Sequence, residues 1–313
     1  MPTAPYIDSL DRAVLPPQPL HLAIGMFDGV HLGHRAVVEA AVQSARAAGG
    51  LAGVLTFWPH PSALFRPESP TRSMQDPAAK AGLLRTLGVD VVIVHPFTPE
   101  LAGVCGEDFL PWLKQRLPHL ASVYVGENFR FGQGRRGDVA LLVAEGRKHG
   151  IHVFSAPRVN LDGEPISSTR IRAQLAAGDI QAVNTLLGYT YFAEGTVRGG
   201  KRLGRTIGFP TLNVPWAPEL APRLGVYAVR VVGAKSAAAL PAVANYGVRP
   251  TVENTTEPRL EVHVLGPCPY TEGDAVRVEW LCFLRPEMKF GSLDELRAQI
   301  ARDRAGAEKF FQR

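Results

Sequence analysis

The chain has 313 residues, enough for two domains of about 150 residues each. Hydrophobic residues make up 46% of it and charged residues 20%, as is usual in globular enzymes that dissolve in water. The net charge of +5 suits anionic ligands, but the chain lacks a lysine and arginine cluster with interleaved aromatic residues, so a nucleic-acid partner is not expected.

Short apolar segments alternate with amphipathic segments through the first half of the chain. We expect strands at residues 21–27, 51–58, 89–94, 122–125 and 151–154, and helices at 35–48, 77–87, 108–117 and 139–149. The alternation predicts a Rossmann-like α/β domain with a parallel sheet and right-handed crossovers. In such sheets ligands bind beyond the carboxyl ends of the strands, where each motif discussed below lies.

The turn after the first strand, residues 23–34, combines glycines with a pair of histidines. The glycines leave much of the turn without Cβ atoms, so a ligand can approach the backbone closely. Backbone N–H groups and the dipole of the following helix favour an anion there. His31 and His34 lie on one side of the first helical turn and can both donate to one phosphate group. We therefore expect a phosphate site rather than two exposed histidines at a helix start.

The sequence of this turn, G-x-F-D-G-V-H-x-G-H, resembles the nucleotidyltransferase signature of the bacterial bifunctional riboflavin kinase/FAD synthetase family. Later motifs extend the resemblance over almost the whole chain. It implies an FMN adenylyltransferase domain at the N-terminus, in which His31 and His34 are catalytic. It also implies nucleotide contacts at the matching positions of the turn, which are Gly25, Phe27, Asp28, His31 and His34.

Two further strand ends carry candidate residues. Pro59-His60-Pro61 follows the second strand, and its prolines alone favour a structural turn, whereas the family resemblance places His60 beside the flavin or nucleotide. A later strand leads into a glycine-rich loop with basic tips, where the resemblance implies a nucleotide contact at Asn128. The loop contains G-x-G-x-x-G, but it follows a late strand, which argues against a dinucleotide fingerprint.

The segment I-S-S-T-R-I-R, residues 166–172, opens a helix that we expect to run from 170 to 187. Serine and threonine before a helix are ordinary N-caps. The arginines, however, add donors suited to phosphate oxygens. The segment matches the family motif that holds the triphosphate opposite the paired histidines, which implies Ser168, Thr169 and Arg172 as nucleotide contacts.

The composition changes near residue 188. We expect strands at 191–197, 211–214, 225–232, 242–246, 260–265 and 275–284, and a closing helix at 293–312. Turns rich in glycine, proline and asparagine separate the strands. This pattern predicts a small antiparallel β-barrel with a terminal helix. The change in composition predicts a domain boundary near residue 187, and the resemblance implies an adenylyltransferase domain at residues 1–187 and a riboflavin kinase domain at residues 188–313.

A basic glycine-rich loop and a polar strand edge open the second half. The loop nearly matches a P-loop but lacks its Ser/Thr, and we take Gly200, Lys201 and Gly204 as nucleotide contacts instead. The sequence that follows it resembles the riboflavin-kinase motif G-x-P-T-A-N. Its Thr211 and Asn213 face one side of an extended chain and supply oxygen ligands suited to Mg²⁺.

In the segment Leu-Glu-Val-His-Val, alternation puts Glu261 and His263 on one face and the valines in the core. A kinase must remove the proton of the ribityl hydroxyl, and a strand-borne carboxylate suits a general base. The family base matches Glu261, whereas His263 has a structural interpretation. The resemblance further implies that Asn245 and Arg249 line or pack the flavin pocket.

Together these motifs predict an enzyme that phosphorylates riboflavin to FMN and adenylylates FMN to FAD, using ATP and Mg²⁺. Three other functions stay open from the residues alone. H-x-G-H does not name the acceptor, so another adenylyl- or cytidylyltransferase is one alternative. A non-catalytic flavin- or RNA-binding regulator is a second, and an NAD-dependent oxidoreductase, supported by the glycine triplet alone, is a third.

The sequence contains no paired cysteine motif, no signal-peptide pattern and no long apolar run. Cys105, Cys268 and Cys282 are scattered, which argues against a disulfide framework and a zinc site. The N-terminus does not resemble a signal peptide, and apolar runs stay well short of the ~18 residues that span a bilayer. We expect a cytoplasmic protein with small-molecule substrates and no membrane partner, and a homo-oligomer stays open.

Overall fold

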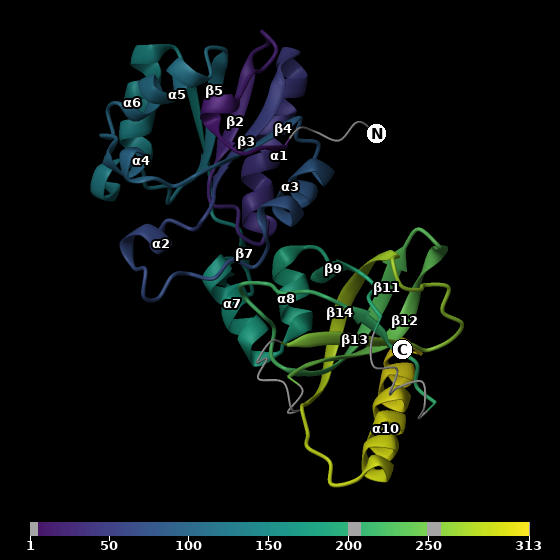
Figure 1. Cartoon of the computed structure of the whole chain (residues 1–313). Helices are drawn as coiled ribbons and strands as arrows, with labels where there is room; N and C mark the ends of the chain where they lie inside the picture. The colour runs from purple at the N-terminus through teal and green to yellow at the C-terminus, as the bar shows by residue number, and fades with distance from the viewer. Residues whose placement is uncertain (1–5, 200–207, 249–257, 313) are drawn as a thin grey trace. The chain divides into compact units, whose positions relative to one another are not determined.

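The computed structural model describes residues 6–199, 208–248 and 258–312. The chain divides into two compact units, Met1–Ser168 and Thr169–Arg313. Figure 1 shows an α/β unit in purple to teal and a β-rich unit that runs from teal through green to yellow. The helices in the described ranges are all too short or too polar to cross a membrane.

The N-terminal unit is built on a six-stranded sheet in the order β1-β4-β3-β2-β5-β6, and every neighbouring pair is parallel. Its strands are β1 (Tyr6–Ile7), β2 (Leu20–Ile24), β3 (Leu51–Phe57), β4 (Val91–His95), β5 (Leu120–Gly126) and β6 (His152–Ala156). From β2 the chain winds outward to β3 and β4, and then returns to continue through β5 and β6 on the other side. The order therefore reverses between β2 and β5, where ligands bind in open parallel sheets.

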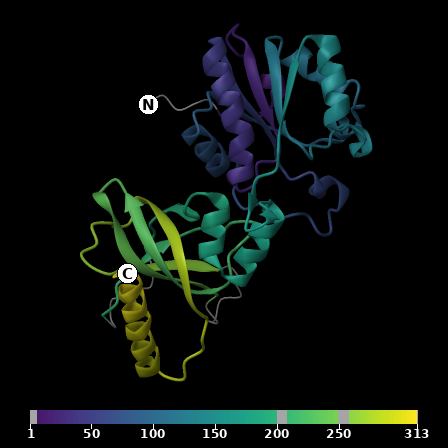
Figure 2. The same ribbon diagram turned by 180° about the vertical axis from the view of Figure 1, so that it is seen from behind.

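Helices cover both faces of this sheet, as the two opposite views in Figures 1 and 2 show. They are α1 (Leu32–Ala48), α3 (Pro77–Thr86), α4 (Pro99–Gly103), α5 (Phe109–Arg116) and α6 (Val139–His149). The short helix α2 (Ser62–Phe65) lies in the loop that follows β3. Apolar residues of α1 and α3 form one buried cluster with the strands. Residues of α4, α5 and α6 form the other on the opposite face. The predicted parallel α/β fold is confirmed.

Some elements of this unit carry too little sequence signal to be predicted. The edge strand β1 has two residues, as do both strands of the hairpin β7 (Asn160–Leu161) and β8 (Glu164–Pro165). Hydrophobic periodicity cannot register in so short a segment.

The predicted single helix at 170–187 is wrong. The structure has two helices there, α7 (Ser168–Ala177) and α8 (Ile180–Leu187). Gly178 between them has a φ of +85°, a conformation that ends a helix and that glycine adopts most easily. Asp179 then caps α8 by accepting a hydrogen bond from the N–H of Ala182. The compact units divide before most of α7, whereas the functional boundary at residue 187 stays a prediction.

The C-terminal unit is an antiparallel sheet in the order β10-β13-β12-β11-β14-β9. Its strands are β9 (Phe192–Thr196), β10 (Leu212–Val214), β11 (Gly225–Gly233), β12 (Ser236–Gly247), β13 (Arg259–Val264) and β14 (Ala275–Pro286). The sheet curls until its two edges meet, since the N–H of Arg198, just beyond β9, donates to the carbonyl of Asn213 in β10 at 2.9 Å. The predicted antiparallel barrel is confirmed.

Aromatic side chains fill the barrel. Trp280 is fully buried and meets the ring of Tyr227 edge-on with centroids 4.7 Å apart. Tyr191, Trp216 and Tyr246 surround it. Burial raises the pKa of Tyr246 to about 12, because the ionised phenolate would lose its hydration in this core.

The terminal helix α10 (Leu293–Phe311) packs on the outside of the barrel. Its Ala307 is buried against Val226 and Val243 of the sheet. Beside this contact, the guanidinium of Arg285 on β14 makes two 2.7 Å hydrogen bonds to the carboxylate of Asp303 on α10. A bidentate ion pair of this kind fixes both distance and orientation, so the helix is held firmly to β14.

Candidate functional site

The turn after β2, together with the first turn of α1, carries five of the predicted nucleotide contacts. His31 is the N-cap of α1, and its Nδ1 accepts a hydrogen bond from the N–H of His34 at 3.3 Å. In a neutral His31 ring the proton therefore lies on Nε2, which makes that atom the donor. The helix dipole adds partial positive charge at the same place.

The two imidazoles of this turn stack on each other. The ring centroids of His31 and His34 lie 3.6 Å apart with 15° between the planes. Gly33 permits this, since a Cβ there would come within 3.2 Å of the His31 ring. The ring of Phe27 is buried and meets His34 edge-on, while a Cβ on Gly25 would approach Phe27 to 3.1 Å. The small residues of the motif thus make room for the rings.

Asp28 connects this turn to two distant parts of the unit. Its buried carboxylate accepts a hydrogen bond from the N–H of Met74 at 2.9 Å. Its carbonyl accepts one from the hydroxyl of Ser168, also at 2.9 Å. The structure therefore brings the first residue of α7 onto the histidine turn, although the two are far apart in sequence. Thr169 and Arg172 lie further along α7, in the second compact unit.

Asn128 lies just beyond β5, the strand beside β2 in the sheet. It is exposed, in a turn closed by a 2.9 Å hydrogen bond from the N–H of Phe129 to the carbonyl of Gly126. The glycine pattern after it serves packing, since a Cβ on Gly137 would lie 2.8 Å from the ring of Phe131. The histidine turn and Asn128 therefore follow neighbouring strand ends at the point where the strand order reverses.

His60 is tied to its own turn. Its Nδ1 accepts a hydrogen bond from the N–H of Ser62 at 3.1 Å and lies 2.8 Å from the hydroxyl of the same residue. That hydroxyl in turn accepts the N–H of Thr71 at 2.7 Å. These contacts give His60 a role in closing the loop around α2, and a contact with flavin stays a prediction.

In the C-terminal unit, strand pairing aligns the predicted kinase residues. Glu261 on β13 lies directly opposite Asn213 on β10 and opposite Asn245 on β12. Residues directly opposite in antiparallel strands place their side chains on the same face, with Cβ atoms about 5 Å apart. A carboxylate with an amide on either side therefore stands on one face of the sheet. Thr211, immediately before β10, is exposed.

His263 stands two residues further along β13. It is 8% exposed, and its Nδ1 lies 2.8 Å from the carbonyl of Pro210. Because a carbonyl can only accept, Nδ1 is the donor. Phe209 meets the ring edge-on. His263 thus holds the chain in front of Thr211, in line with its structural interpretation. Gly200, Lys201, Gly204 and Arg249 lie outside the described residues.

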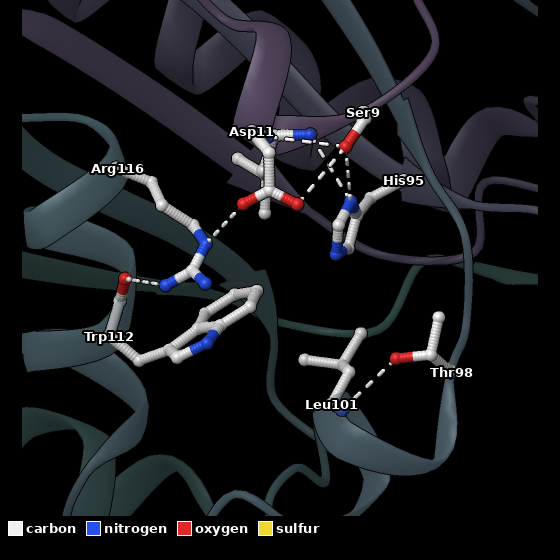
Figure 3. Close-up of polar contacts among 8 residues, drawn as sticks. Ser9, Asp11, His95, Thr98, Leu101, Trp112 and Arg116 are labelled. Atoms are coloured by element: carbon white, nitrogen blue, oxygen red, sulfur yellow. Dashed lines mark hydrogen bonds and ion pairs between the residues drawn. The ribbon is translucent and has the colours of Figure 1, made fainter.

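A polar cluster at the end of β4 was missed by sequence reasoning (Figure 3). The Nδ1 of His95 accepts the N–H of Leu10 at 3.1 Å, and the ring lies near Trp112. Arg116 lies over that indole and donates to Asp11 at 2.8 Å. Burial lowers the pKa of His95, and the hydrogen bond from Arg116 lowers the pKa of Asp11. The cluster fastens residues 9–11 to the sheet.

Sequence reasoning also missed the segment 74–80, which contacts the histidine turn. Gln75 accepts the N–H of Gly29 at 3.2 Å, and the ammonium of Lys80 donates to the carbonyl of Met26 at 2.9 Å. One signal was available, because Lys80 falls on the apolar face of α3 with Ala81 and Leu84. A lysine at a buried helical position requires polar partners.

Comparison with known proteins covers nearly all of the chain. The sequence model of the FAD synthetase family matches residues 16–170, and that of the riboflavin kinase family matches residues 187–311. A bifunctional riboflavin kinase/FMN adenylyltransferase of Escherichia coli (strain K12) is 39% identical over 290 residues, which is 93% of this chain and 92% of the relative. A protein of the same name from Bacillus subtilis (strain 168) is 32% identical, again over 93% and 92% of the two chains.

A solved structure has the same architecture. The crystal structure titled as a macrolide-efflux protein from Streptococcus pneumoniae superimposes with a TM-score of 0.84 and 26% sequence identity. The match covers 98% of this chain and 99% of that one. Both units described here are therefore present in that structure.

Proposed function

The chain belongs to the family of bifunctional riboflavin kinase/FMN adenylyltransferases, and on this premise we propose that the two clusters described above are its two reaction sites. As an enzyme of this family it phosphorylates riboflavin with ATP to give FMN, and it adenylylates FMN with a second ATP to give FAD and pyrophosphate. The kinase matches the C-terminal part and the adenylyltransferase the N-terminal part.

The stacked histidines at the start of α1 are the observation that carries the N-terminal assignment. In adenylyl transfer a phosphate oxygen of FMN forms a bond to the α-phosphorus of ATP, and the bond to the bridging oxygen breaks as pyrophosphate leaves. The attacking phosphate is already ionised, so positioning and positive potential supply the catalysis rather than a general base. His31 and His34, with the N–H groups of the turn, are donors for the phosphates.

Other residues complete the adenylyltransferase proposal. Gly25 and Asp28 shape the turn, and the buried ring of Phe27 packs edge-on against the ring of His34. Asn128 contributes an exposed amide at the neighbouring strand end. From the family motif we assign Ser168, Thr169 and Arg172 as nucleotide contacts, and the hydrogen bond from Ser168 to the turn supports this for the first of them.

For the kinase, Glu261 is the proposed general base. Its carboxylate accepts the proton of the ribityl hydroxyl while that oxygen forms a bond to the γ-phosphorus of ATP, and ADP leaves. The strand register supports this, because it places the two amides beside the carboxylate. Gly200, Lys201 and Gly204 are assigned to the nucleotide, and Asn245, Arg249 and His60 to flavin, from the family motifs.

The oxygen donors on this face fit Mg²⁺. The hydroxyl of Thr211 and the amide oxygen of Asn213 are hard ligands, and Asn213 lies opposite the carboxylate of Glu261. A magnesium ion here would neutralise charge on the phosphates of ATP. Thr211 and Asn213 are therefore the residues that would hold it. We also propose a cytoplasmic location, where ATP and flavins are available.

Incubation of the whole protein with riboflavin, ATP and Mg²⁺, followed by chromatography of the flavins, tests the proposal. FMN is expected first and FAD after it. Accumulation of FMN without FAD would remove the N-terminal assignment. FAD formed from added FMN, but not from riboflavin, would remove the C-terminal one.

A further inference from the structure

The histidine turn is held from outside by the segment 74–80, which the reaction scheme above does not use. The N–H of Met74 donates to the buried carboxylate of Asp28 at 2.9 Å. The side chain of Gln75 accepts the N–H of Gly29 at 3.2 Å. Both contacts reach the part of the turn between the end of β2 and the paired histidines, so the segment determines where that backbone lies.

Lys80, in the first part of α3, makes a third contact. The side chain is 1% exposed, and its ammonium donates to the carbonyl of Met26 at 2.9 Å. It also lies 3.3 Å from the hydroxyl of Thr56, which donates to the same carbonyl at 2.9 Å. Lysine is among the residues least often buried, because its ammonium loses hydration there. A lysine kept inside the unit at this point therefore calls for an explanation.

The backbone conformation of the histidine turn explains why a lysine is buried here. Phe27 has a φ of +45° and Val30 a φ of +41°. Positive φ is unusual for any residue with a side chain and a clear outlier for a β-branched one. Such conformations persist only where surrounding contacts over-determine them. The carbonyl of Met26, immediately before Phe27, is where Lys80 and Thr56 bind, so their hydrogen bonds fix the entry to the strained part.

We propose that Lys80 is a positioning residue for adenylyl transfer, acting through the carbonyl of Met26 on the turn that carries His31 and His34. Its hydrogen bond holds the backbone so that the turn's N–H groups and imidazoles face the phosphates. The role rests on the assignment of this turn to ATP.

The alternative is that Lys80 only stabilises the fold. The bifunctional chain offers an internal test, because riboflavin kinase activity resides in the other part of the same molecule. Lys80→Met removes the ammonium and keeps most of the side-chain volume. Lys114→Met is the matched control. Lys114 lies on α5, and its ammonium also donates to a backbone carbonyl, that of His149 at 2.7 Å, which is not part of the histidine turn.

The experiment measures kcat and KM for FAD formation from FMN and ATP, kinase activity, and thermal unfolding, in full-length protein. For Lys80→Met we expect kcat for FAD formation to fall about 100-fold, as for other small displacements of catalytic groups. The KM for FMN and the kinase rate should be unchanged. Lys114→Met should retain wild-type FAD formation. A merely structural role would lower the melting temperature and leave kcat per folded molecule intact.

Gln75→Met keeps the proposal testable if Lys80→Met fails to fold. It removes the acceptor of the Gly29 N–H from a half-buried position, and kcat for FAD formation should fall about tenfold, the equivalent of one hydrogen bond. Full adenylyltransferase turnover in folded Lys80→Met would overturn the positioning role. So would full turnover in Gln75→Met when Lys80→Met does not fold. Wild-type protein that makes no FAD would instead remove the function assigned to the turn.

Discussion

The turn of the N-terminal unit and the carboxylate face of the C-terminal unit are assembled in opposite ways. His31 and His34 are neighbours in sequence and meet within one helical turn. Glu261, by contrast, meets Asn213 and Asn245 only because three strands pair in one register. The first arrangement is local and strained, and it depends on contacts from segment 74–80. The second is regular in its backbone and depends on the long-range pairing of the barrel.

This difference predicts how each site should fail. A change in the local turn should affect one reaction and leave the fold of the other unit intact. A change that loosens the barrel or its helix should affect the kinase residues together, because a shift of register moves every side chain on a strand.

Glu261→Gln should give the largest loss. Removing a general base costs about 10²–10⁴-fold in rate, so riboflavin phosphorylation should fall by that range while FAD formation from FMN stays at the wild-type rate. Steady-state assays of both reactions on the same preparation measure it. Glu279→Gln, another half-buried carboxylate on a barrel strand, is the control and should retain kinase activity. An equal loss in the two variants would contradict the role of Glu261.

His31→Asn should impair FAD formation and leave riboflavin phosphorylation unchanged, the opposite of Glu261→Gln. Asparagine is a good N-cap, so α1 should keep its start, but the imidazole donor is lost. FAD formation from FMN should fall about 10²–10³-fold, the usual loss when one donor to a developing charge is removed. Kinase activity should be unchanged. His119→Asn, at an exposed position of the same unit, should have no effect on either rate, and unchanged FAD formation in His31→Asn would refute the assignment.

Asp303→Ala should weaken the barrel through its helix. It leaves Arg285 without the carboxylate that binds it in a largely buried position, and breaking such a pair costs about 3 kcal/mol. Chemical denaturation should therefore show a lower unfolding midpoint for the C-terminal unit. Glu308→Ala removes an exposed ion pair on the same helix and should cost no more than about 0.5 kcal/mol. Similar midpoints for the two variants would show that α10 does not depend on the buried pair.

The smallest effect is a pH dependence of stability at His95. Burial lowers the pKa of this histidine, so the unfolded state binds its proton more readily than the folded state. The contribution of His95 is therefore complete above its ordinary pKa of about 6.5 and is lost as the pH falls from there through the lowered value. Asparagine can accept the N–H of Leu10 without titrating, so His95→Asn should show less loss of melting temperature between pH 7 and pH 5. Burial also lowers the pKa of His21. Its effect on stability should be the same in the wild type and in His95→Asn, so it does not alter the difference between them.

The sequence predicts the repeating architecture of both units because periodicity and turn residues act locally. It also predicts the histidine turn, whose residues are contiguous. It misses the break at Gly178, since a single glycine is compatible with a continuous helix until packing is known. It cannot reveal that Ser168 binds the carbonyl of Asp28, or that Gln75 accepts the N–H of Gly29, because these contacts join segments distant in sequence. Alternation places Glu261 on a face, but only pairing identifies its neighbours.

If the chain holds two independent phosphate sites, two variants that each lack one of the reactions should complement each other in a mixture. Neither Glu261→Gln nor His31→Asn alone should make appreciable FAD from riboflavin, ATP and Mg²⁺. An equimolar mixture should make it, because FMN released by the kinase of one protein can be adenylylated by the other. A mixture that stays inactive, or FAD produced at the wild-type rate by either protein alone, would contradict the two-site account.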